Sequence, residues 1–124
     1  MNSDTLSFDQ RFQLLIESGQ ATPQSVSAAK SALRTVERHY GVQLTEAVGG
    51  SLANHLAITL KRLLDGAALM QAPEAVWREI QEFPEEVALA GRMVALLEAE
   101  LNLSIPRDEV GFIALHLCRI RMEL

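Results

Sequence analysis

Helix-boundary residues divide this chain into segments of helical length, and their spacing constrains the fold more than any other feature. Thr22 is a capping residue followed by proline at the first helical position, and Gly41 is a stop signal further on. Pro73 opens another segment, and Phe83-Pro84 interrupts the chain again because proline lacks a backbone N–H. The sequence between these boundaries is therefore expected to form separate helices.

Apolar residues recur at helical spacing inside the segments, and no strand pair or hairpin turn is found. The third helix is expected to follow Val48-Gly49-Gly50, and the last to start near Ile105-Pro106. The sequence predicts an all-α fold, a compact antiparallel bundle of about five or six helices. The expected helices are one that starts at Ser7 or Asp9 and ends before Gly19, then 23–40, 51–64, 73–82, 84–101 and 106–124.

Composition excludes several classes of function. The chain of 124 residues fits one domain, and its net charge of -5 with no basic block argues against direct contact with nucleic acid. The single cysteine, Cys118, excludes an internal disulfide and suits a reducing compartment. Residues 1–10 hold no apolar signal core, and no apolar run reaches membrane-spanning length. We expect a cytoplasmic protein without a membrane partner.

One histidine lies at the edge of a predicted apolar stripe in segment 51–64. At about 100° per residue, four leucines align on the core side of that helix: Leu52, Leu56, Leu60 and Leu63. His55 lies about 100° to one side of Leu56, on a flank shared with Thr59 and Arg62. We expect His55 at the boundary between core and solvent.

The last segment repeats this arrangement. Its core stripe consists of Val110, Ile113, Leu117 and Ile120. His116 lies about 100° to the same side of Leu117, with Glu109, Phe112 and Glu123 on its flank and Arg119 just beyond. Each of the two histidines therefore directly precedes a core leucine.

A boundary histidine suits a phosphate acceptor, because one ring nitrogen is open to a donor while the other is held by a hydrogen bond. A guanidinium such as that of Arg62 or Arg119 can then pair with the new phosphate. A boundary histidine is also often a packed residue without chemistry. Periodicity alone leaves both interpretations open.

A metal site is the chemical alternative. His116 and Cys118 are two positions apart on a helix, so their side chains diverge by about 200° and do not share a metal easily. No metal-ligand motif and no glycine-rich phosphate loop occurs. We expect no metal and no cofactor, and a helical metalloenzyme would require tightly bound metal. His39, near a helix end, is assigned no function.

The two histidine segments resemble the signature helices of the PTS regulation domain, or PRD, of BglG-type antiterminators and activators. The segments are Ser51-Leu-Ala-Asn-His-Leu-Ala-Ile-Thr-Leu-Lys-Arg62 and Ile105-Pro-Arg-Asp-Glu-Val-Gly-Phe-Ile-Ala-Leu-His-Leu117. The likeness extends from about Val26 to the C-terminus, through Gly66, Phe83-Pro84 and Glu86. It implies a single PRD helical domain at 21–124 behind a short N-terminal extension at 1–20.

The resemblance also implies a function. It suggests a non-enzymatic regulator that senses the sugar phosphotransferase system through reversible phosphorylation of His55 and His116. The donors would be the phosphocarrier HPr, an EIIB component, or both. Asp108 and Glu109 match the acidic pair of the second signature and would orient a histidine or stabilise dimer contacts.

The implied protein is a homodimer that acts through protein contacts, including those with a possible downstream regulator. Its output would be control of transcription of a sugar-utilisation operon. Family regulators usually carry two PRDs behind an RNA- or DNA-binding domain, whereas one PRD is expected here.

The chain departs from the family at the first signature, which usually reads Asp-His and here reads Asn54-His55. An amide cannot orient an imidazole with a negative charge, so His116 is expected to be the better acceptor. A binding module that works by helical association without phosphorylation is the alternative.

Overall fold

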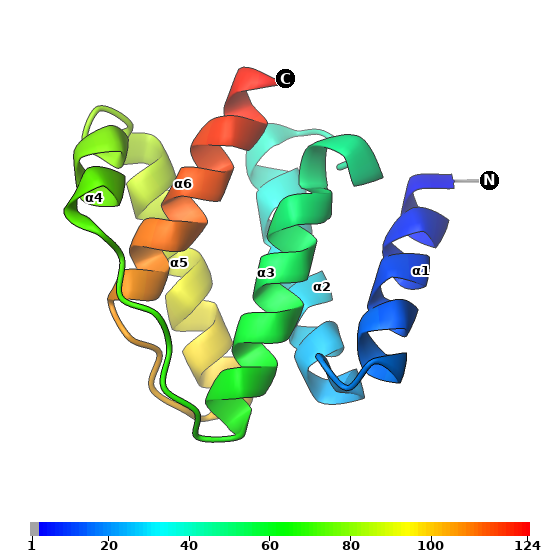
Figure 1. Ribbon diagram of the computed structural model, residues 1–124. Coiled ribbons are helices and arrows are strands. Elements are labelled where there is room, and N and C mark those ends of the chain that lie inside the picture. The colour runs from blue at the N-terminus through cyan, green and yellow to red at the C-terminus, as the bar shows by residue number, and fades with distance from the viewer. Residues whose placement is uncertain (1–2) are drawn as a thin grey trace. The chain divides into compact units, whose positions relative to one another are not determined.

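The structure is a computed structural model that describes residues 3–124, and within them it contains helices and no strand (Figure 1). The all-α prediction is confirmed. Two compact units make up the chain, Met1–Leu69 with the first three helices and Met70–Leu124 with the last three. The helices are α1 (Ser3–Glu17), α2 (Pro23–Tyr40), α3 (Glu46–Leu64), α4 (Glu74–Ile80), α5 (Pro84–Leu101) and α6 (Asp108–Met122).

The bounds of α2 are those predicted, and its caps explain them. The Thr22 side-chain oxygen accepts a hydrogen bond from the Ser25 backbone N–H at 3.1 Å, and the Ser25 hydroxyl accepts one from the Thr22 N–H at 3.0 Å. This reciprocal capping box satisfies N–H groups that the first turn leaves unpaired. At the other end Gly41 adopts the left-handed conformation, with φ 66, and its N–H donates to the Glu37 carbonyl.

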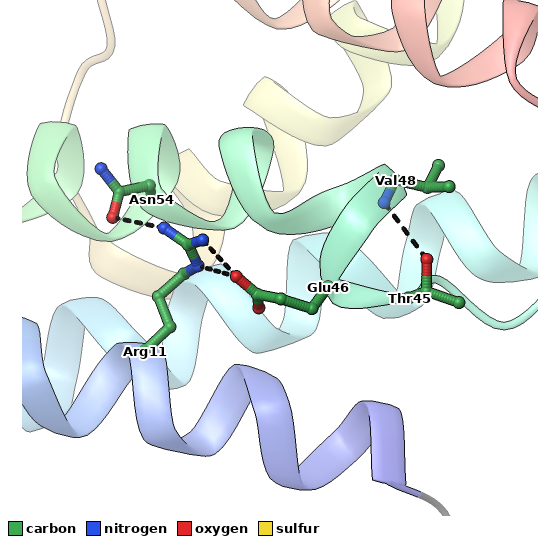
Figure 2. A network of polar contacts seen from close by, with 5 residues as sticks. All are labelled: Arg11, Thr45, Glu46, Val48 and Asn54. Carbon is green, nitrogen blue, oxygen red and sulfur yellow. Dashed lines mark hydrogen bonds and ion pairs between the residues drawn. The ribbon is translucent and has the colours of Figure 1, made fainter.

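Helix α3 begins at Glu46, so the prediction of a start at Ser51 was wrong. The Thr45 side chain caps it by accepting from the Val48 N–H at 3.1 Å (Figure 2). Gly49 and Gly50 are therefore helical residues and not a helix break. A Cβ on Gly49 would lie 3.1 Å from Leu44 Cβ and from Phe8 Cζ of α1, so a missing side chain permits close packing.

Helix α1 also starts earlier than expected, at Ser3 and not at Ser7 or Asp9. It packs against α3, and its Phe12 is buried. An ion pair of 3.0 Å joins Asp9 Oδ1 of α1 to Lys30 Nζ of α2. Helix α1 is thus held by contacts with both other helices of its unit.

In the second unit, α6 packs against both α4 and α5 (Figure 1). A Cβ on Gly111 of α6 would lie 3.1 Å from Cζ2 of Trp77 on α4, so glycine lets the indole ring approach the helix. The Arg107 guanidinium lies over the same ring, 4.9 Å from its centroid. Helix α5 spans the predicted residues 84–101, and its C-cap Asn102 is left-handed, with a φ of 51.

We predict opposite effects for the same substitution at two helical glycines of this unit. A Cβ added to Gly91 of α5 would have no heavy atom within 4 Å, so Gly91→Ala raises the free energy of unfolding by about 0.5–1 kcal/mol through helix propensity. Gly111→Ala lowers it by about 1 kcal/mol because the methyl group overpacks against Trp77. Urea unfolding measures both, and equal stabilisation by the two substitutions would contradict this packing.

Candidate functional site

His55 lies at the edge of the α3 core, as predicted. Leu52, Leu56 and Leu60 are at most 2% exposed, whereas His55 is half-buried. Leu63, expected in the same stripe, is only half-buried because the stripe ends near the helix C-terminus. Burial of Leu56 fixes the side of the helix on which the His55 ring is placed.

An arginine side chain of α1 binds the residue that directly precedes His55 (Figure 2). Arg11 Nη1 donates to Asn54 Oδ1 at 3.1 Å, and Arg11 Nε donates to Glu46 Oε1 at 2.7 Å. Arg11 Nη2 and the same Glu46 oxygen form an ion pair. We call these three side chains the Arg11 clamp. The arginine joins α1 to both the first turn and the middle of α3.

Arg62, the cation predicted to support His55, makes a different contact. Its side chain is exposed, and Nη2 donates to the Ala68 carbonyl oxygen at 3.0 Å. That bond ties the helix end to the loop that follows α3. Arg11 is instead the cation bound to the neighbour of His55.

His116 occupies the corresponding position on α6. Ile113, Leu117 and Ile120 are at most 3% exposed, and His116 beside Leu117 is half-buried. Val110, expected in the same stripe, is half-buried and not a core residue. The predicted boundary position is therefore found for this histidine too.

The two acidic supporting residues lie in the first turn of α6, two turns before His116. Carboxylates are favoured there by the positive end of the helix dipole. Asp108 is half-buried and Glu109 is 4% exposed. Seven residues of helix rise by about 10.5 Å, so Glu109 and His116 are separated by about two turns of α6.

Two arginines near the end of α6 have different surroundings. Arg119, which follows His116 by one helical turn, is exposed. Arg121 Nη1 lies 2.9 Å from Glu86 Oε1, and the Glu86 side chain is completely buried at the start of α5. The Arg121 guanidinium also lies over Phe83, 5.8 Å from the ring centroid. Arg121 thus stabilises the α5–α6 contact, while Arg119 faces solvent.

The remaining candidate groups show no further chemistry. Burial raises the pKa of the Cys118 thiol, with nearby Glu86 and Glu79 adding to the effect, so the thiol stays protonated and weakly nucleophilic. Among the described residues no group of histidine, cysteine and acidic side chains could hold a metal ion. Within that same part of the chain, every helix is too short or too polar to cross a membrane.

Three contact residues were missed by sequence reasoning: Arg11, Glu46 and Arg121. The Gly49-Gly50 pair carried a signal, since adjacent glycines inside a helix indicate close approach of another element. Thr45 likewise offered an N-cap that places Glu46 in the first turn. Nothing in the local sequence indicates that Arg11, far away along the chain, is the partner.

We expect Arg121 and Arg119 to differ in stability measurements. Arg121→Gln removes the positive charge that lies against the buried Glu86 carboxylate and lowers the free energy of unfolding by about 2 kcal/mol. The matched change Arg119→Gln, at an exposed position, alters it by less than about 0.5 kcal/mol. Thermal or urea unfolding measures both. Equal losses of unfolding free energy in the two variants would show that the ion pair between Arg121 and Glu86 contributes nothing specific to stability.

Comparison with known proteins places this geometry in a family. Transcription antiterminator LicT of Bacillus subtilis (strain 168) is 26% identical over 112 residues, which cover 90% of this chain and 37% of the antiterminator. The chain thus spans little more than a third of that relative. The crystal structure of GlcT CAT-PRDI has the same fold, with a TM-score of 0.68 and 21% identity over 95% of this chain and 66% of that one.

The PRD domain family model matches residues 30–120, a range that contains both His55 and His116. Because the match covers most of the sequence, the likeness is a property of the chain as a whole and not of one motif. The chain belongs to the PRD domain family.

Proposed function

We propose that this chain is a regulatory domain that senses the phosphotransferase system through reversible phosphorylation of His55 and His116. The observation that carries the proposal is the matched placement of the two histidines. Each is half-buried, each precedes a fully buried leucine, and both lie within the PRD match. A packed helix holds the ring in place, while its edge stays open to a donor protein.

The proposed reaction is a phosphoryl transfer. The lone pair of an unprotonated ring nitrogen attacks the phosphorus, an N–P bond forms, and the donor's bond to phosphorus breaks with its electron pair kept by the donor. The second ring nitrogen keeps its proton. The step needs no metal ligand or cofactor from this chain, and we propose that the chain is not an enzyme.

We propose His116 as the stronger acceptor. Arg119, one turn later and exposed, can turn towards a phosphoryl group on His116. Asn54, by contrast, offers a neutral oxygen beside His55, and that oxygen accepts from Arg11. A neutral group engaged with α1 orients the His55 ring less firmly than a carboxylate would.

The proposed partners follow from the family. Phosphate would come from HPr, an EIIB component, or both, and the chain would act in the cytoplasm as a homodimer on a downstream regulator of sugar-operon transcription. We propose that residues 21–124 form the PRD and that residues 1–20 are an N-terminal extension. New negative charge on a helix edge changes which protein surfaces fit against it.

A second candidate function is a binding module that works without phosphorylation. The Arg11–Asn54 hydrogen bond favours it, because the side chain before His55 serves the contact between α1 and α3. Such a module would act through helical association alone. The two candidates differ in whether phosphate is ever transferred.

The test is phosphorylation of the full chain with Enzyme I, HPr and phosphoenolpyruvate, read by mass spectrometry under non-acidic conditions. We expect His116→Ala to lose most of the label and His55→Ala to lose the smaller part. His39→Ala is the matched control and keeps full labelling, since His39 packs its ring edge-on against Tyr40 at 4.8 Å between centroids.

Two results would change the proposal. Full labelling of His116→Ala with none of His55→Ala would reverse the ranking of the acceptors. No label on wild type with HPr or with EIIB components would favour the passive binding module.

A further inference from the structure

Helix α1 docks on α3 through a contact for which α3 leaves space. A Cβ on Gly50 would lie 2.8 Å from Glu46 Oε1 and 2.9 Å from Arg11 Nη2, so the Arg11 clamp closes over the missing side chain. Glu46, Gly50 and Asn54 follow one another at four-residue spacing on one face of α3. The guanidinium lies along this face (Figure 2).

The clamp ends at Asn54, the residue directly before His55. Helix α1 itself lies outside residues 30–120, so the family match gives it no role. An open pocket lies beside the clamp. Its lining residues are Gln10, Arg11, Leu14, Leu15, Glu46 and Asn54.

We propose that Arg11 is a positioning residue that couples the charge at position 55 to the docking of α1. The proposal deepens the proposed function, since it rests on phosphate being accepted at His55. A negative charge at position 55 tightens α1 on α3. Docked α1 in turn favours the phosphorylated state of His55.

The sign of this coupling follows from which helix carries each charge. Arg11 is brought to this face by α1, whereas Glu46 belongs to α3 and stays near His55 whether or not α1 is docked. Docking therefore adds one positive charge beside position 55. A second ion pair of α1, between Asp9 and Lys30, is neutral in sum and lies towards α2.

Coupling between two equilibria is reciprocal. If charge at position 55 stabilises docked α1, then docked α1 stabilises that charge by the same factor. For single charges that interact near a protein surface and are screened by solvent and salt, we expect a factor of about three. The effect should weaken at high salt.

A double-mutant cycle tests the coupling without any phosphate donor. Hydrogen exchange of backbone amides in residues 8–17 reports the opening of α1. We expect exchange to be about threefold slower in His55→Glu than in the isosteric control His55→Gln. In an Arg11→Gln background the difference should vanish, since the charge that α1 contributes is gone.

Lys30→Gln is the matched control. It removes the ion pair with Asp9 and loosens α1, but it leaves the Arg11 clamp in place. Exchange should become faster overall while the difference between His55→Glu and His55→Gln persists. This control therefore distinguishes a helix α1 that is merely less tightly packed from a helix α1 that has lost the coupling to position 55.

A phosphorylation experiment tests the reciprocal effect, which is that of docked α1 on the phosphorylation of His55. Arg11→Gln should lower the ratio of phosphorylated to unphosphorylated His55 about threefold relative to wild type and leave that ratio unchanged at His116. Equal exchange in His55→Glu and His55→Gln, or a difference that survives Arg11→Gln, would overturn the proposal. Absence of phosphate on His55 in wild type would instead refute the proposed function at that residue, whatever the cycle shows.

Discussion

Burial of one leucine on each of two helices is the constraint on which the candidate sites depend. Leu56 is 2% exposed and Leu117 is fully buried, so neither helix can rotate without exposing its core stripe. Successive helical residues differ by about 100°, so the residue before each leucine is turned away from the centre of the core, and both histidines are half-buried there. His55 and His116 therefore hold fixed, half-buried positions without needing a loop or a metal to place them.

Glycine contacts then decide how closely other helices approach these two. Gly50 leaves space for the Arg11 clamp on α3, and Gly111 leaves space for Trp77 against α6. Each unit thus combines a leucine core with a contact that a single methyl group would disturb. In the second unit, the buried Glu86 and its partner Arg121 add an electrostatic link between α5 and α6.

The helical architecture could be predicted from the sequence because residues close together in the chain determine where most helices begin and end. The Thr22 cap and the Gly41 stop each act within a few residues, and both were identified correctly. The start of α3 was missed because Gly49-Gly50 resembles a helix break when the packing partner is unknown. Boundary placement of both histidines was predictable from periodicity, whereas the Arg11 clamp depends on a contact between distant segments that periodicity does not encode.

The central claim, that two helix-edge histidines accept phosphate, is tested most directly by phosphorus-31 NMR of the full chain after treatment with a phosphotransferase donor and removal of that donor. We predict phosphoramidate resonances from both His55 and His116, at positions that identify the ring nitrogen carrying phosphorus. The double variant His55→Ala/His116→Ala, which retains His39, should give no such resonance. Undiminished phosphoramidate signal in the double variant, or none in the wild type with any donor, would contradict the claim.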